Sequence, residues 1–425
     1  MSRLEERIAR LSTPEAEQKL TRLYGENQLE FQKERYAGLL KRHEELFGPT
    51  ERVLLVSGPG RAEIGGNHTD HNNGRVLAAS VNLDALAAVS PREDGRVRFC
   101  SQGYPEMELD LAELSPRKAE EGTTPALIRG VAAGMKEAGY RIGGFDAAVT
   151  STVMSGSGLS SSAALEIMIT GILDGLYNRF EMPFIQRAQI GKRAENEFFG
   201  KPSGLLDQMA SAAGGLVTVD FLDNAHPEVR ALQYDFMKKG YALVVVATGG
   251  NHADLTDHYS AIPREMKDVS RFYGRRVLRG LTLVQLMQDM GELRKKYSDR
   301  AILRAIHFIA ENDRVPEQVK ALEEDRMEDF LRLIIASGRS SYMYLQNVFA
   351  DNRDQSLSLA LCMAEILLAG DGAWRVHGGG FAGTTLNFVP AGKVEGFVAA
   401  MEGAFGKGCC SVLNIRPEGA AMLEV

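Results

Sequence analysis

Apolar positions at the start of the chain recur at three- and four-residue steps, which is the spacing of amphipathic helices. This pattern covers residues 3–47 and includes Thr13 and Pro14, a pair typical of a helix N-cap followed by the first helical residue. Segment 57–74 is rich in Gly, Asn, Asp and His, so we expect a loop there. Short apolar runs that predict buried strands lie at residues 53–56, 76–79 and 86–89.

A turn rich in Gly and Ser, residues 155–162, lies between two strongly patterned segments. Alternating apolar residues at 145–153 predict a strand, and apolar residues at helical spacing from 165 to 176 predict a helix. A helix that starts after such a turn presents free N–H groups and the positive end of its dipole, which suits an anion. The serines at 160–162 add hydroxyls that can bind phosphate or Mg²⁺. The alternative is a flexible loop whose serines only cap the helix.

The second half of the chain is predicted to be mainly helical. Apolar and charged residues between 261 and 369 follow helical spacing, as in a bundle, and we expect Pro263 and Pro316 to separate helices. Residues 378–383 have the glycine spacing of a dinucleotide fingerprint. The alternating residues after them predict a strand where that fingerprint requires a helix, so a Rossmann fold is not expected.

Length and composition indicate a two-domain protein of moderate charge. The 425 residues exceed one ordinary core, and a turn-rich segment at 223–228 divides them into domains 1–235 and 236–425. A net charge of −7 argues against nucleic acid or an anionic membrane as a partner. The four cysteines form neither a metal-binding spacing nor a disulfide framework, and no signal peptide or apolar run of membrane-spanning length is found. We therefore expect a cytoplasmic protein.

Polar residues elsewhere are ambiguous when each is taken alone. His68 and His71, with an aspartate between them, form a weak zinc pattern that fits local hydrogen bonding equally well. Asp207 precedes a predicted helix as an N-cap would, and Glu195 lies on a charged helix where solvent exposure is the ordinary explanation. Walker-type and protein-kinase signatures are missing from the sequence, which excludes those two classes of phosphate-binding protein.

Together, the motifs resemble those of the GHMP family of small-molecule kinases, and within it the galactokinases. Residues 60–74 are similar to the galactokinase signature Gly-Arg-x-Asn-x-Ile-Gly-Glu-His-x-Asp-Tyr. Residues 155–166 match the family's nucleotide motif Gly-x-Gly-Leu-Ser-Ser-Ser-Ala, and 204–208 match the Gly-Ile-Met-Asp-Gln loop that carries the catalytic Asp. Further resemblances to galactokinases lie at 31–36, 378–384 and 416–420.

The resemblance implies a role in phosphoryl transfer for each motif. Asp207 would lie at the attacking sugar hydroxyl with Arg61 beside it, and Ser162 and Glu195 would hold Mg²⁺. We expect Arg61 to lower the pKa of Asp207. The residues implied to bind ATP or line the point where sugar and phosphate meet are Ser155, Gly156, Ser157, Gly158, Leu159, Ser160, Ser161, Ser162, Gly379 and Gly380. Those implied to contact the sugar are Asn67, His68, Asp70, Gly204 and Tyr259.

The resemblance also implies a fold and an activity. The fold is α+β, with an N-terminal domain like ribosomal protein S5, a ferredoxin-like C-terminal domain with extra helices, and the ligands between them. The implied protein is a monomer or weak homodimer that uses ATP and Mg²⁺ to phosphorylate the C1 hydroxyl of galactose.

The sugar-binding signature departs from its usual form. Glu63, Asn67 and His71 stand where the family has Asn, Glu and Tyr. An asparagine offers one acceptor and an NH₂ donor where a carboxylate accepts from two hydroxyls. Another acceptor, such as a different hexose, an N-acetylhexosamine or a pentose, therefore stays open. A regulator that binds sugar and ATP without turnover is a further alternative, although the serines of the nucleotide motif and Asp207 favour an enzyme.

Overall fold

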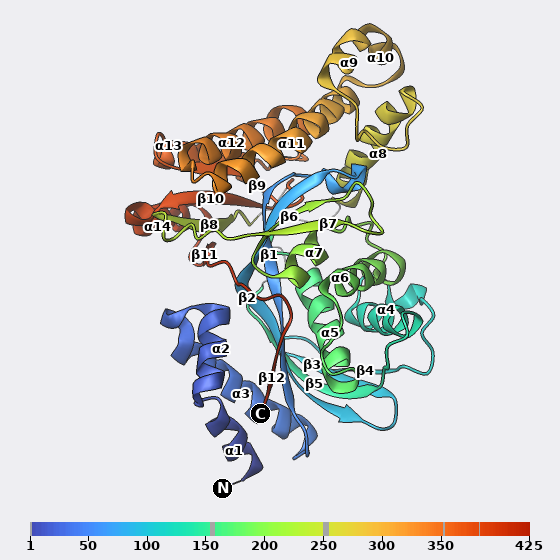
Figure 1. Cartoon of the computed structure of the whole chain (residues 1–425), viewed down its shortest axis with the longest axis vertical. Coiled ribbons are helices and arrows are strands. Elements are labelled where there is room, and N and C mark those ends of the chain that lie inside the picture. Colours follow the sequence, from blue (N-terminus) through green and yellow to red (C-terminus); the bar gives the residue numbers. More distant parts are fainter. Residues whose placement is uncertain (1, 154–157, 250–254, 352, 382) are drawn as a thin grey trace.

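The computed structural model describes residues 2–153, 158–249, 255–351, 353–381 and 383–425 (Figure 1). Within these residues the strands form two sheets, and six strands of the larger sheet follow the order β12-β1-β2-β5-β3-β4. Strand β6 pairs with β2, and β7 extends the sheet from β6. The strands of the larger sheet are β1 (Leu54–Gly65), β2 (Arg75–Arg92), β3 (Arg96–Ser101), β4 (Met107–Asp110), β5 (Gly144–Ser151), β6 (Leu216–Asp220), β7 (Glu228–Leu232) and β12 (Ala421–Glu424).

Helices cover both faces of this sheet (Figure 1). Leu54 and Val56 of β1 belong to the same buried cluster as Met168, whereas Leu55 between them packs in a cluster with Leu39. Because successive side chains of a strand point to opposite faces, burial on both sides makes the run of apolar residues continuous. The helices around the sheet are α1 (Arg3–Arg10), α2 (Pro14–Tyr24), α3 (Leu29–Phe47), α4 (Thr124–Glu137), α5 (Ser161–Tyr177), α6 (Phe184–Arg193) and α7 (Leu206–Ala213).

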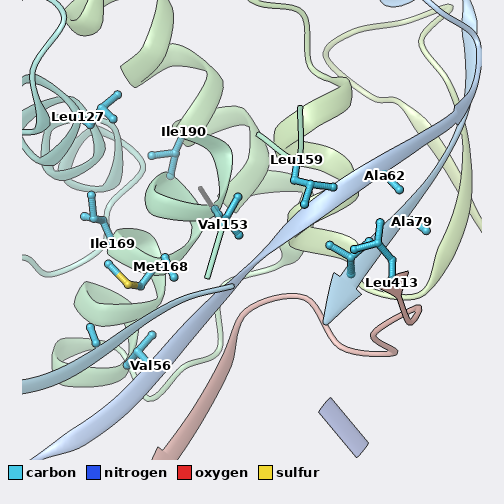
Figure 2. Close-up of a cluster of buried hydrophobic side chains, with 14 of the residues drawn as sticks. Val56, Ala62, Ala79, Leu127, Val153, Leu159, Met168, Ile169, Ile190 and Leu413 are labelled. Carbon is cyan, nitrogen blue, oxygen red and sulfur yellow. The ribbon is translucent and has the colours of Figure 1, made fainter. Parts of the chain in front are cut away.

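The largest hydrophobic cluster lies between β1 and the helices that follow the Gly/Ser turn. Figure 2 shows Met168 of α5 and Ile190 of α6 gathered with Val56 of β1, and all three are buried. Val153 and Leu159, on either side of the turn, belong to the same cluster. The turn is therefore anchored at both ends by apolar packing.

The smaller sheet lies in the C-terminal half and is antiparallel in the order β11-β8-β10-β9. Its strands are β8 (Tyr241–Ala247), β9 (Ala373–His377), β10 (Thr384–Pro390) and β11 (Cys410–Leu413). In Figure 1, α11 and α12 lie on the side of this sheet away from the N-terminus, while α8, α9 and α10 extend outward from it. The helices of this half are α8 (Thr256–Phe272), α9 (Leu283–Gln288), α10 (Met290–Lys296), α11 (Asp299–Glu323), α12 (Met327–Ser340), α13 (Ser356–Leu368) and α14 (Val394–Phe405).

Several predicted elements are confirmed. Thr13 caps α2 by accepting a hydrogen bond from Ala16 N at 3.4 Å, with Pro14 as the first helical residue. The predicted strand before the Gly/Ser segment and the predicted helix after it are β5 and α5, and strand β10 follows the Gly-rich segment 378–383, as expected. The C-terminal strand β12 pairs antiparallel with β1 in the larger sheet. The division at residue 235 stays a prediction. None of the described helices combines the length and apolar character needed to cross a membrane.

Three predictions about element boundaries were wrong. The predicted loop from residue 57 instead continues β1 as far as Gly65, because β1 pairs with β2 along its length with register shifts on either side of Arg61 and Glu63. The two short strands predicted in β2 are a single strand of 18 residues. Pro263 and Pro316 lie inside α8 and α11 rather than between helices. A proline forfeits one helical hydrogen bond, and the buried neighbours Ile262 and Val315 supply packing that offsets this loss.

Candidate active site

Two glycines of β1 allow the nucleotide-motif helix to lie directly against the strand. A Cβ atom at Gly58 would collide with the backbone of α5, lying 2.6 Å from Met168 N, and one at Gly60 would lie 2.9 Å from Leu159 O. Arg61 N donates to Leu159 O at 3.0 Å, which fixes the end of the turn to the strand. The strand glycines thereby place Arg61 beside the start of α5.

Asp207, in the first turn of α7, lies at the centre of a hydrogen-bonded group. Its Oδ1 accepts from Arg61 Nε at 2.7 Å, and its Oδ2 accepts from Ser160 Oγ at 2.8 Å. A second guanidinium nitrogen of Arg61 donates to the carbonyl of Gly158. Burial alone would raise the pKa of Asp207, but the charges of Arg61 and Lys201 outweigh it and hold the pKa below its usual value. The expected direction of this shift is confirmed, and Asp207 is ionised at neutral pH.

Non-glycine residues with left-handed backbone occur in the sugar-signature motif (residues 60–74), the nucleotide motif (155–166) and the Gly-rich third motif (378–384). Ser160, the N-cap of α5, has φ 59° and ψ 70°, while φ is 57° at His68 and 63° at Phe381. Such conformations cost free energy and persist where surrounding contacts enforce them, which is common at functional sites. These three residues thus lie in segments that resemble family motifs, while other described non-glycine residues with positive φ lie elsewhere in the chain.

A second polar group surrounds Glu195, which lies in the π-helical segment Ala194–Phe199 after α6. Its Oε1 accepts from Ser162 Oγ at 2.7 Å and from Lys201 Nζ at 2.8 Å. Its Oε2 accepts from Gln208 Nε2 at 2.8 Å, and the same nitrogen donates to Glu166 at 2.9 Å. Burial and the charge of Glu195 raise the pKa of Glu166 well above its usual value, so Glu166 is neutral.

The side-chain oxygens of Ser162 and Glu195 fit a magnesium ion that is held mainly by the phosphates of a bound nucleotide. A hydroxyl and a carboxylate are oxygen ligands, which Mg²⁺ prefers, and Mg²⁺ commonly takes only one or two protein ligands in addition to phosphates and water. The described residues contain no group of three or more acidic, histidine or cysteine side chains arranged to hold a metal by themselves. Ser162 and Glu195 thus match a site that is completed by a nucleotide.

The sugar loop connects β1 to β2, and Asn67 within it is fully buried. Its side-chain NH₂ donates to Glu63 Oε1 and Gly378 O, both at 2.8 Å. Its oxygen accepts from Asn347 Nδ2 at 3.0 Å and from Ser341 Oγ at 3.2 Å. Asn67 is therefore held on all sides by protein groups.

Glu63, which stands where the family has Asn, pairs with a buried arginine. Arg375 Nη2 lies 2.7 Å from Glu63 Oε1, and Arg375 Nη1 donates to Ile64 O at 2.6 Å. Burial raises the pKa of Glu63, while the charges of Arg375 and Arg61 oppose the rise. The amide and carboxylate of the usual signature are both present, at exchanged positions.

The other predicted sugar contacts lie around the same loop. Asp70 Oδ2 accepts from Leu206 N at 3.3 Å, and a Cβ atom at Gly204 would collide with Asp70. The His68 ring contacts Gly379 O at 3.1 Å, and burial, followed by the neighbouring His71, lowers the pKa of His68 to about 4. The structure thus brings the loop next to Asp207 on one side and next to the third motif on the other.

The third motif packs against both other motifs. A side chain at Gly158 would collide with Thr384, one at Gly379 would lie 2.6 Å from the Tyr259 ring, and one at Gly380 would collide with Asn347. Tyr259 itself donates to Gly380 O at 3.0 Å. Glycine is thus required for close approach at each of these three positions. The predicted nucleotide contacts Ser155, Gly156 and Ser157 lie outside the described residues.

Sequence reasoning missed several polar residues of these groups. Lys201 is half-exposed in a loop, and no pattern in the sequence predicts its contact with Glu195. Gln208 is part of a recognised motif, but its bridge between two glutamates depends on the packing of α7 against α5 and α6. Arg375 and Asn347 come from distant elements of the C-terminal half, so only the fold places them at the sugar loop.

Comparison with known proteins agrees with this arrangement. The family model described as the galactokinase galactose-binding signature matches residues 41–91, and the GHMP kinases N terminal domain matches residues 126–215. A galactokinase of Streptomyces coelicolor is 32% identical over 367 residues, which are 86% of this chain and 92% of that protein. The chain belongs to the galactokinase family.

Solved structures extend the relationship to the whole galactokinase fold. The crystal structure of Lactococcus lactis galactokinase complexed with galactose matches with a TM-score of 0.81 and 25% identity, covering 91% of this chain and 100% of that one. A mevalonate kinase matches with a TM-score of 0.59 and 15% identity, covering 87% and 98%, and shares the fold. The predicted GHMP kinase fold is confirmed.

Proposed function

We propose that this chain is a galactokinase that transfers the γ-phosphoryl group of ATP to the C1 hydroxyl of galactose. The observation that carries the proposal is the ionised Asp207, which Arg61 and Ser160 hold at the junction of the three motifs. Similarity to galactokinases over most of the chain supports both the reaction and the acceptor. The complete set of serines at 160–162 favours an enzyme over a regulator that lacks turnover.

The side chains would act mainly by alignment and charge. Asp207 accepts a hydrogen bond from the attacking hydroxyl and takes up its proton late, which suits a weak base when the transition state is loose. Arg61 keeps the carboxylate ionised and oriented. The N-terminus of α5 and the glycines of the third motif bind the phosphates, where backbone N–H groups favour negative charge.

Ser162 and Glu195 would hold Mg²⁺, and bound Mg²⁺ neutralises charge on the phosphate oxygens. Lys201 forms a charged hydrogen bond to Glu195 that orients its carboxylate. His68, Asp70, Gly204 and Tyr259 would form the sugar site, and the predicted contact Asn67, whose amide is fully bonded to protein groups, would instead hold the loop in place. A cytoplasmic location and a monomeric or weakly dimeric state stay predictions.

The decisive experiment is a coupled ADP-release assay against a panel of sugars, with ³¹P NMR identification of the product. We expect turnover with galactose and a product phosphorylated at C1. Turnover with another sugar and not with galactose would identify that sugar as the acceptor. ATP binding without turnover on any sugar would overturn the proposal that the chain is an enzyme.

Asp207→Asn tests the role assigned to that carboxylate. We expect kcat to fall by about 10³-fold or more, because the amide cannot accept the proton. Binding of a fluorescent nucleotide serves as the control and should stay close to that of the unmodified protein, whereas the melting temperature should fall because buried Arg61 loses its counter-charge. A variant with near-normal kcat would rule out the role.

A further inference from the structure

A large open cavity lies on the outer side of the sugar loop. Its volume is about 600 Å³, within the range of small-molecule sites. One wall is the second half of α8 with the turn after it, another wall is the end of α6, and Asp70 and Gly204 also line the cavity. Arg61, Asn67, Asp207 and Tyr259, which surround the reacting position, do not line it. The cavity therefore adjoins the proposed sugar site without being the place of phosphoryl transfer.

The cavity carries an unusual concentration of positive charge. Its lining includes five cationic side chains, Lys192, Lys267, Arg271, Arg275 and Arg276, with Asp70 as the one carboxylate among the lining residues. The chain as a whole has a net charge of −7, so the charge of the cavity lining is opposite in sign to the net charge of the protein. Like charges confined to a concave surface repel one another, and the same geometry concentrates a field that attracts anions.

Most of these cations lack a neutralising partner. Arg271 pairs with Asp268 at 2.6 Å on the exposed side of α8, and Arg275 donates to the carbonyl of Arg279 at 3.1 Å. Across the described parts of the chain, no carboxylate forms an ion pair with Lys192, Lys267, Arg275 or Arg276. An anion bound in the cavity would relieve the repulsion that the protein leaves uncompensated.

The cations come from two different helices that line the cavity. Lys267 and Arg271 are four residues apart on α8, so they lie one above the other on the same side of the helix. Lys192 lies in the last turn of α6, on the other wall. A ligand that contacts both walls needs negative charge at more than one end, which a compound with two phosphate groups or a phosphate ester with a polar body provides.

We propose that this cavity is a binding site for a small phosphorylated anion, separate from the nucleotide loop. Because Asp70 and Gly204 belong to both the cavity lining and the proposed sugar site, the bound anion lies next to the acceptor. Its binding depends on the cavity cations and not on turnover, so it is measurable whether or not galactose is the acceptor.

The test is isothermal titration of inorganic pyrophosphate and, in parallel, of a hexose 1-phosphate into the purified full chain. K267A/R271A removes two cavity cations, while R294A/K295A removes one arginine and one lysine from the exposed surface of α10 and is the matched control. Because the nucleotide loop also binds anions, the comparison between these variants carries the result. We expect the cavity variant to bind at least tenfold more weakly and the control to bind within twofold of the original protein.

A second variant tests the other wall. Lys192→Ala should weaken the same ligand severalfold, since one anion contacts both walls. All of the substituted side chains are partly or fully exposed, so the variants should keep the original melting temperature. Tighter binding of pyrophosphate identifies a free polyphosphate as the preferred class, and tighter binding of the hexose 1-phosphate identifies a sugar ester. Equal affinity in the cavity and control variants would overturn the proposal, as would an absence of binding to the original protein.

Discussion

Arg61 and Asp207 form an ion pair in which the cation controls the protonation of the anion. Burial would raise the pKa of Asp207, and the guanidinium at 2.7 Å is the largest influence that lowers it. A carboxylate with a lowered pKa is ionised over most of the physiological range, so the proposed base would be lost only in acid. If Asp207 is the base that we propose, this pair should set the acidic limit of activity as well as the position of the carboxylate.

Replacing Arg61 should move that acidic limit. In Arg61→Gln we expect the acidic limb of the kcat/KM profile to shift to higher pH, because the uncompensated burial then raises the pKa of Asp207. The rate plateau should also fall. Initial rates between pH 4 and 8 would measure both effects. An acidic limb at its original pH, together with a lowered plateau, would show that Arg61 acts on something other than this carboxylate.

A second prediction follows from the exchanged positions of the carboxylate of Glu63 and the amide of Asn67. In Asn67→Glu two buried carboxylates would face each other at hydrogen-bonding distance, and we expect the free energy of unfolding to fall by about 2–4 kcal/mol. Adding Glu63→Asn restores one amide and one carboxylate, so the double variant should recover at least about 1 kcal/mol. Urea denaturation of the four proteins gives the coupling energy. Additive effects of the two substitutions would disprove the pairing.

At the scale of elements, α3 packs on the sheet through a buried histidine. The His43 ring contacts Ser90 Oγ of β2 at 3.1 Å. Burial, with help from Arg7, lowers the pKa of His43 to about 4, although Asp146 of β5 opposes the shift. The folded protein thus keeps His43 neutral at a pH where the unfolded chain is protonated, so stability is complete above about pH 6.5 and falls as the pH drops toward 4.

His43→Gln should remove this part of the pH dependence. Between pH 7 and pH 5, protonation of His43 in the unfolded chain should lower the free energy of unfolding of the original protein by about 2 kcal/mol. The free energy of unfolding of the variant should therefore fall by about 2 kcal/mol less over the same pH range. His226→Gln, which changes an exposed ring, is the control and should leave the pH dependence unaltered. Chemical denaturation at the two pH values measures the difference. Parallel losses in all three proteins would refute the explanation.

Elements were predictable from the sequence where local patterns determine them. The cap of α2, the β5–turn–α5 unit and the bundle helices follow from residue spacing and capping chemistry. The length of β1 was not predictable, because its Gly-rich second half forms a strand only by pairing with β2 and by lying against α5. Likewise, the motifs identified Asp207 and Glu195, whereas Lys201 and Arg375 reach them only through long-range packing.

At the scale of the whole molecule, Asp84 joins distant segments of the chain. This fully buried carboxylate accepts from Arg35 of α3 at 2.7 Å and from Arg416 near the C-terminal strand at 3.3 Å. Tyr24 and Ser57 also donate to it. The N- and C-terminal segments that resemble galactokinases, 31–36 and 416–420, thus meet at one acidic residue of the central sheet.

Asp84→Asn should therefore be strongly destabilising. The substitution leaves Arg35 and Arg416 buried without a counter-charge, which costs about 3–5 kcal/mol. Asp94→Asn removes a carboxylate from a more exposed pair with Arg92 and should cost much less, because solvent screens that pair. Thermal and urea denaturation compare the two. Equal, small losses would show that the buried cluster contributes no more than a surface ion pair.

Strand β1 carries Arg61, which pairs with Asp207, and leads into the sugar loop. Arg61 and Glu63 are two residues apart in a regularly paired stretch, so they point to the same face, about 7 Å apart along the strand. The whole strand is buried and leads directly into the sugar loop. A library that varies only the partly exposed loop residues His68, Asp70 and His71 would therefore change side chains of the proposed sugar site while the buried strand keeps Arg61 in place. For directed evolution, the loop that follows β1 is thus the segment to vary when another sugar is wanted, and β1 itself should be left unchanged.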